Sequence, residues 1–84
     1  MQIEYRKEAL KYLARMNEPM KSVVAAAIRE LAHEPPEGDI AKLQGREGYR
    51  LRVNNYRVIY RIDGDTIIIR DIAPRGEIYK RKAK

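Results

Sequence analysis

Seven arginines and no lysine lie between positions 46 and 75, a composition suited to binding phosphate. These are Arg46, Arg50, Arg52, Arg57, Arg61, Arg70 and Arg75. The planar guanidinium group can make two parallel hydrogen bonds to a phosphate, whereas the ammonium group of lysine acts as a point charge. The whole chain carries 18 basic and 12 acidic residues and a net charge of +6. We therefore expect a polyanionic partner, either a nucleic acid or an acidic protein.

The alternation of side chains along two expected strands, 49–53 and 56–62, determines which arginines lie together. Asn54-Asn55 between the two strands predicts a tight hairpin. The residues expected to face the core or its edge are Tyr49, Leu51, Val53, Tyr56, Val58, Tyr60 and Ile62. The arginines expected to lie together on the other face are Arg50, Arg52, Arg57 and Arg61.

Four like charges on neighbouring strands destabilise a sheet, and a bound phosphate would remove that cost. This grouping predicts an anion site. The alternative is that Glu47, Asp71 or Glu77 neutralises some of the arginines, Arg61 or Arg70 in particular.

Two helices are expected upstream of these strands. From Glu8 onward the first places Leu10, Leu13 and Met16 on one side, and Asn17 is suited to a left-handed C-cap. Pro19 suits the first turn of the second helix. The apolar stripe of that helix consists of Met20, Val23, Val24, Ala27, Ile28 and Leu31, and Pro35-Pro36 follows its end.

The order of elements indicates an α+β fold in a single domain, 1–84. We expect an N-terminal strand (3–5) and a helical hairpin packed on one face of a largely antiparallel, four-stranded twisted sheet. The segment 37–48 is expected to be a polar connector, Asp63-Gly64-Asp65 a second hairpin and 66–72 a β-branched strand. Residues 77–80 suggest a short last strand, and the basic tail 80–84 is expected to be frayed.

Several classes of protein are excluded or disfavoured by composition. The chain has no cysteine, so neither a disulfide framework nor a thiolate metal site is possible. No apolar run approaches the roughly 20 residues that cross a bilayer, and the first residues, MQIEYRKEAL, have no signal-peptide pattern. The acidic residues lack the clustering of a two-metal nuclease. We expect a soluble cytoplasmic protein with no membrane partner, no metal and no cofactor.

The segment Lys42–Lys80 resembles the C-terminal half of the RelE/ParE toxin superfamily, and the upstream helical hairpin extends the resemblance to essentially the whole chain. Its landmarks are Lys42-Leu43-x-Gly45, Tyr49-Arg50-Leu51-Arg52, Tyr56-Arg57-Val58-Ile59-Tyr60 and Arg75-x-Glu77-Ile78-Tyr79. The resemblance implies the toxin of a type II toxin-antitoxin pair. It further implies a RelE-type mRNA interferase, a metal-independent endoribonuclease that enters the ribosomal A site and cleaves the bound codon.

The resemblance also assigns the catalytic residues. Arg50 and Arg52 occupy paired basic positions, Arg57 is the arginine of the next strand, and Arg75 and Tyr79 are the C-terminal arginine and tyrosine. Attack of a ribose 2′-hydroxyl on the adjacent phosphate builds negative charge that guanidinium groups can stabilise, with Arg57 and Arg75 as candidates. Tyr79 would stack on a base or orient the hydroxyl. Further RNA contacts are expected from Lys42, Arg46, Arg61 and Lys80.

The general base is not assigned by the sequence. Some relatives have lysines at the positions of Arg50 and Arg52, and others have a histidine where this chain has Pro74. Arginine does not titrate near neutral pH. His33, the only histidine, is interpreted as a cation at the C-terminal end of the second helix.

Two other readings of the same fold remain open. One is a ParE-like inhibitor of DNA gyrase, and the other is a mainly regulatory component of a DNA-binding toxin-antitoxin complex. In every case the resemblance implies a cognate antitoxin, and a chain of charge +6 favours an acidic antitoxin segment. Operator DNA would be contacted only through the antitoxin complex.

Overall fold

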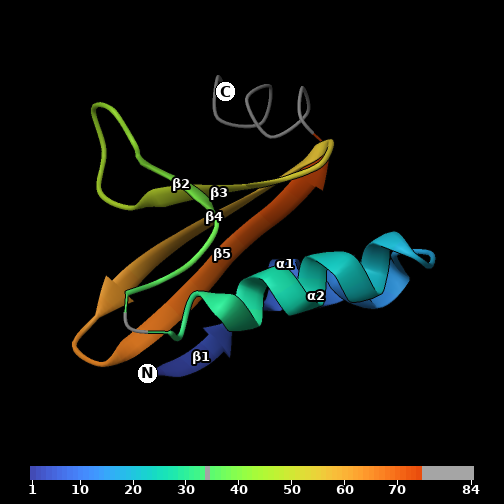
Figure 1. Cartoon of the computed structure of the whole chain (residues 1–84), viewed down its shortest axis with the longest axis horizontal. Helices are drawn as coiled ribbons and strands as arrows, with labels where there is room; N and C mark the ends of the chain where they lie inside the picture. The colour runs from blue at the N-terminus through green and yellow to red at the C-terminus, as the bar shows by residue number, and fades with distance from the viewer. Residues whose placement is uncertain (34, 75–84) are drawn as a thin grey trace.

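The computed structural model describes residues 1–33 and 35–74, and the elements follow each other in the order β-α-α-β-β-β-β (Figure 1). They are β1 (Gln2–Tyr5), α1 (Lys7–Arg15), α2 (Met20–Glu30), β2 (Asp39–Lys42), β3 (Tyr49–Val53), β4 (Tyr56–Asp63) and β5 (Thr66–Pro74). No helix within the described residues is both long and apolar enough to span a membrane.

The five strands form one sheet in the order β1-β5-β4-β3-β2. β1 runs parallel to β5, and every other neighbouring pair is antiparallel. The expected α+β class and largely antiparallel sheet are confirmed, but the expected number of four strands is wrong. The additional strand is β2, a four-residue edge strand inside the segment expected to be a connector. The last strand expected at 77–80 lies outside the described residues.

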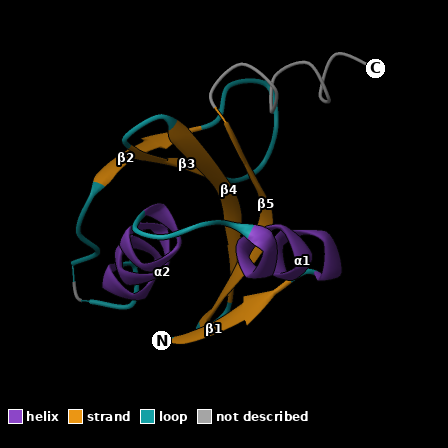
Figure 2. Ribbon diagram, turned by 90° about the vertical axis from the view of Figure 1, so that its right-hand side faces the viewer, coloured by secondary structure: helices purple, strands orange, loops and turns teal. Residues whose placement is uncertain are grey.

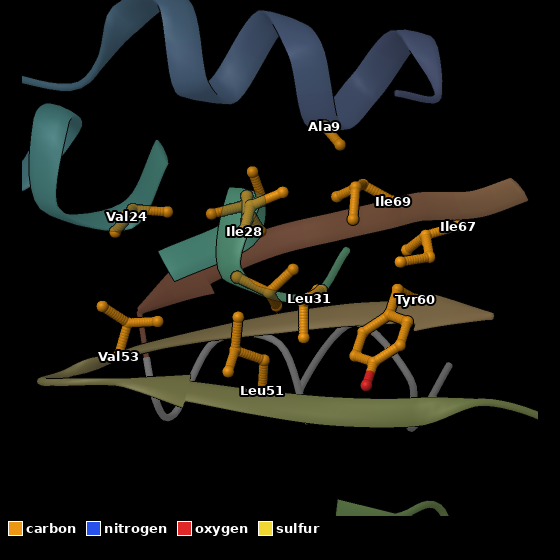
Figure 3. Close-up of a cluster of buried hydrophobic side chains, with 11 residues drawn as sticks. Ala9, Val24, Ile28, Leu31, Leu51, Val53, Tyr60, Ile67 and Ile69 are labelled. Atoms are coloured by element: carbon orange, nitrogen blue, oxygen red, sulfur yellow. The ribbon is translucent and has the colours of Figure 1, made fainter. Parts of the chain in front are cut away.

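Both helices pack on one face of the sheet, and the main core fills the space between the two layers (Figure 2). Figure 3 shows Ile28 and Leu31 above Leu51, with Ala9 of α1 above Ile69 of β5. The largest fully buried side chains are Ile28, Leu31, Leu51, Ile67, Ile69, Ile72, Val24 and Val58. The core side assigned to β3 and β4 by alternation is confirmed for Leu51, Val53, Val58 and Tyr60.

Three residues expected to face the core are exposed: Leu10, Val23 and Ile62. α1 turns Ala9, not Leu10, toward β5, because a small side chain lets the helix approach the sheet closely. Ile62 has the correct parity but lies near the end of β4, beyond the cover of the helices.

The turns follow the sequence signals at two hairpins and depart from them between the helices. Asn54 and Gly64 adopt positive φ, 53° and 64°, in the β3–β4 and β4–β5 hairpins. Asn17 does not adopt the expected left-handed conformation, because Met16 ends α1 with extended backbone. The side chain of Ser22 lowers the pKa of Glu18 by hydrogen bonding, and the backbone N–H of Ser22, which donates to Oε1 of Glu18 at 3.0 Å, lowers it further.

Candidate phosphate-binding site

Rows of paired residues cross the face of the sheet opposite the helices. The first row consists of Asp39, Arg52, Arg57 and Ala73, one from each of β2, β3, β4 and β5. The second row consists of Ala41, Arg50, Ile59 and Asp71. Side chains of paired residues project from the same face. The shared face expected for Arg50, Arg52 and Arg57 is therefore confirmed, and we call it the arginine face.

Asp39 provides a carboxylate to the arginine face that the sequence did not suggest. Its carboxylate lies 3.8 Å from Nη1 of Arg50 and 3.6 Å from Nη1 of Arg52. Since the side chain of Asp39 is 54% exposed, water screens both ion pairs. The partial neutralisation expected on this face is present, but Asp39 was not among the acids expected to supply it.

The three arginines of the site differ in their access to solvent. The side chain of Arg52 is 47% exposed and that of Arg50 is 15% exposed, while Arg57 is buried at 5%. Nη1 of Arg50 is buried and makes no hydrogen bond within the described residues. A buried donor without a hydrogen-bond acceptor is costly, and the carboxylate of Asp39 at 3.8 Å offsets part of that cost. Arg52 is the arginine that an incoming anion meets first.

A small apolar cluster lies beside the arginines on the same face. Ile59 and Ala73 are buried there, and Leu43 packs against them. Ala73 is the direct partner of Arg57 across β4 and β5. Apolar neighbours lower the local dielectric, which strengthens the interaction of nearby guanidinium groups with an anion.

Arg61 has the parity of the arginine face but lies at its far end, two residues beyond Ile59. Its Nη1 is 3.8 Å from the carboxylate of Asp63. Neutralisation of Arg61 was expected, although by a different acid. Lys42 pairs with Tyr49 and therefore has the opposite parity. Arg61, Lys42 and Arg46 line a common pocket, so these predicted RNA-binding residues are grouped away from Arg52 and Arg57.

The tyrosines at the core edge form two aromatic pairs. Tyr49 stacks on Tyr60 with ring centroids 5.4 Å apart, and Tyr12 contacts Tyr56 edge-on at 6.5 Å. Burial, with a smaller contribution from Tyr49, raises the pKa of Tyr60 to about 12. The expectation that Tyr49, Tyr56 and Tyr60 have core or core-edge roles is confirmed.

His33 follows the end of α2, the position expected for it, and its Nδ1 lies 3.4 Å from Glu30 and 3.5 Å from Glu37. This is the group within the described residues whose side chains could jointly hold a metal ion. It belongs to α2 and the following connector and not to the strands that carry the arginines. Arg75, Tyr79 and Lys80 lie outside the described residues, so their assigned roles stay predictions.

Comparison with known sequences places the chain among toxins. The family model described as "ParE toxin of type II toxin-antitoxin system, parDE" matches residues 3–79. A curated relative, Toxin RelE3 of Methanocaldococcus jannaschii, is 48% identical over 42 residues, which cover 49% of this chain and 48% of the relative. The matched segment thus spans about half the length of that relative.

Solved structures share the fold over nearly the whole chain. The RelB-RelE antitoxin-toxin complex from Methanococcus jannaschii includes a chain with a TM-score of 0.77 and 29% identity, covering 93% of this chain and 96% of the other. The archaeal RelE-RelB complex from Pyrococcus horikoshii includes a chain with a TM-score of 0.73 and 29% identity. The match covers 89% of this chain and 94% of the other. The isolated RelE toxin of E. coli, at 17% identity, has a TM-score of 0.75 with 98% and 94% covered, and shows the fold alone.

Proposed function

The chain belongs to the family of ParE toxins of type II toxin-antitoxin systems, and from this premise we propose that it is a ribosome-dependent endoribonuclease of the RelE type. The observation that carries the proposal is the grouping of Arg50, Arg52 and Arg57 in adjacent rows of one sheet face. Identity of 48% to a RelE toxin over half the chain favours the RelE branch.

The proposed reaction is attack of a ribose 2′-hydroxyl on the neighbouring phosphorus atom. The O2′–P bond forms as the P–O5′ bond breaks, which leaves a 2′,3′-cyclic phosphate and a 5′-hydroxyl. Arg52 would bind the phosphate, and the buried charge of Arg57 would stabilise the negative charge of the transition state. Arg75 and Tyr79 would complete the site.

Within the described residues, the arginine face contains no lysine or histidine to act as general base near neutral pH. We infer that rate arises mainly from positioning and electrostatics, with the ribosome contributing part of the geometry. Cleavage of naked RNA is expected to be negligible, and efficient cleavage without ribosomes would contradict this view.

A cognate antitoxin is the proposed protein partner. Two of the similar structures are complexes of RelE with RelB, and by analogy this toxin would be neutralised by an acidic antitoxin segment. Contact with operator DNA would occur through that complex. The active toxin would work in the cytoplasm, where it meets translating ribosomes.

The proposal is tested by single-turnover cleavage of messenger RNA bound in programmed ribosomes. Arg52→Ala is compared with the parent chain and with Arg29→Ala, an exposed arginine on α2 that serves as a matched control for loss of charge. We expect roughly a hundredfold slower cleavage for Arg52→Ala and no change for Arg29→Ala. Equal rates for all three proteins, or no cleavage by the parent, would exclude the proposed site.

Inhibition of DNA gyrase is the second candidate, and the name of the matching family model favours it. The two activities are distinguished by expressing the toxin in cells and mapping transcript ends and DNA breaks. Broken DNA with intact transcripts would favour gyrase as the target. Transcripts cut within codons, with intact DNA, would favour the endoribonuclease.

A further inference from the structure

A basic pocket lies at the end of the sheet away from the β3–β4 hairpin. Its volume is about 450 Å³, and it is lined by Lys42, Arg46, Glu47, Gly48, Tyr49, Arg61 and Ile62. The residues come from the end of β2, the following loop, the start of β3 and the last part of β4. Three cations thus converge on a hollow that contains a single carboxylate.

The pocket is formed where the loop between β2 and β3, residues 43–48, approaches β4 closely. Gly48 has a φ of 121°, and a Cβ atom at this position would lie 2.8 Å from the carbonyl oxygen of Tyr60. The backbone N–H of Leu43 donates to the carbonyl oxygen of Gly48 at 3.0 Å, which closes the loop. The loop is therefore held against β4, and Arg46 and Arg61 line the same pocket.

Two of the three cations in the pocket have no ion-pair partner in the part of the chain that the structure describes. These are Lys42 and Arg46, both exposed, whereas Arg61 has its contact to Asp63 at 3.8 Å. Convergent cations without acidic partners repel one another, and a bound anion would relieve the repulsion. The pocket therefore has the charge of an anion site.

The position of the pocket relative to the arginine face identifies the anion. Arg57, Ile59 and Arg61 are alternate residues of β4 and lie about 6.8 Å apart along the strand, two residues at 3.4 Å each, with the register shift against β5 falling between Ile59 and Tyr60. This spacing is of the order of the separation between successive phosphates of an extended single strand. A strand of RNA with one phosphate at Arg52 and Arg57 would bring the phosphate two nucleotides away to Arg61.

We propose that this pocket is a second RNA subsite, which binds the phosphate two nucleotides from the one held at Arg52 and Arg57. The inference rests on the proposed endoribonuclease function and adds a specific contact to it. Lys42 from the end of the edge strand β2 and Arg46 from the following loop bind the phosphate, and Arg61 joins them from the arginine face. The pocket fixes the register of the RNA on the arginine face, so it contributes to affinity and not to the chemical step.

The test combines a protein variant with a neutral phosphate analogue. Messenger RNAs carrying one uncharged methylphosphonate, placed in turn at each phosphate around the cleavage site, are bound in programmed ribosomes. The half-saturating concentration and the saturated cleavage rate are measured for the parent and for the double variant Lys42→Ala/Arg46→Ala. The control Lys11→Ala/Arg29→Ala removes the same charge from exposed positions on the helices.

For the pocket variant on unmodified RNA we expect a half-saturating concentration about tenfold higher and an unchanged saturated rate. A methylphosphonate two nucleotides from the cleaved phosphate should raise the half-saturating concentration equally for the parent and the control. It should not raise the half-saturating concentration of the pocket variant any further. The pocket assignment would be overturned if the effects of the variant and of the methylphosphonate on the half-saturating concentration were additive at every phosphate. Equal half-saturating concentrations for the pocket variant and the parent on unmodified RNA would also overturn it.

Failure of the endoribonuclease proposal would give a different result, namely no cleavage by the parent at any concentration. Binding of a fluorescent oligouridylate by fluorescence anisotropy then tests the pocket by itself. Loss of binding in the pocket variant, with binding retained in the control, would support the pocket as an RNA-binding site even without endoribonuclease activity. Equal binding by all three proteins, or no binding by the parent, would overturn it.

Discussion

Asp39 and Arg52 are direct partners across β2 and β3, and the carboxylate of Asp39 lies 3.6 Å from the guanidinium group of Arg52. The same carboxylate lies 3.8 Å from Arg50, so one negative charge is shared by two cations of the candidate site. An RNA phosphate that binds these arginines must approach the carboxylate as well. Asp39 therefore stabilises the empty site and opposes the bound anion.

Replacement of Asp39 by asparagine should separate these two effects. We expect Asp39→Asn to lower the half-saturating concentration of programmed ribosomes about fivefold, because an exposed charge pair is worth up to about 1 kcal/mol. The free energy of unfolding should fall by a similar amount, because Arg50 and Arg52 lose their common counterion. Titration of ribosomes and denaturant unfolding measure the two quantities.

Glu8→Gln is the matched control, because it removes one exposed carboxylate from α1, in the helical layer on the other side of the sheet from the arginines. If Asp39→Asn weakened RNA binding while the control did not, the carboxylate would be acting to hold the guanidinium groups in their binding orientation.

The arginine face could be predicted from the sequence because its causes are local. The alternation in β3 and β4 fixes the faces of Arg50, Arg52 and Arg57, and the Asn54-Asn55 turn places the two strands side by side. Neither inference needs knowledge of the rest of the chain.

The contribution of Asp39 could not be predicted, because it depends on pairing between distant residues. β2 has only four residues in a polar segment, and its register against β3 is what brings Asp39 opposite Arg52. The orientation of α1 was missed for a related reason. Helical spacing favoured Leu10, but close packing on β5 selects the smaller Ala9.

The cleavage rate should depend on the planar guanidinium group of the buried Arg57. We expect Arg57→Lys, which keeps the charge but not the planar group of donors, to slow saturated cleavage by roughly a hundredfold. Single-turnover rates on saturating programmed ribosomes measure the effect, with Arg29→Lys on α2 as the control. A rate within twofold of the parent would mean that Arg57 acts only through its charge.

Gly48 should be less replaceable than Gly45 in the same loop. A Cβ at Gly48 would lie 2.8 Å from the carbonyl oxygen of Tyr60 and 3.3 Å from Leu43, at a φ of 121°. Gly45 has a φ of 73°, and nothing lies within 4 Å of its added Cβ. We expect Gly48→Ala to lower the free energy of unfolding by about 3 kcal/mol and Gly45→Ala by about 1 kcal/mol. Equal losses in denaturant unfolding would show that the contact with Tyr60 relaxes easily.

The raised pKa of Tyr60 makes stability depend on pH in the alkaline range. Burial raises this pKa from the ordinary value of 10.0 to about 12, so the folded protein keeps the proton more tightly than the unfolded chain. The resulting stabilisation is complete below pH 10 and is lost as the pH rises toward 12. Its size is of the order of 2 kcal/mol.

Comparison of the parent with Tyr60→Phe isolates this contribution from the other five tyrosines of the chain, which has six in total. Between pH 10 and 12 the free energy of unfolding should fall more steeply for the parent than for the variant. Tyrosinate absorbance should also lose its most alkaline transition in Tyr60→Phe. Parallel stability curves for the two proteins would show that the Tyr60 hydroxyl ionises as readily in the folded state as in the unfolded chain, in spite of its place against Tyr49 in the core.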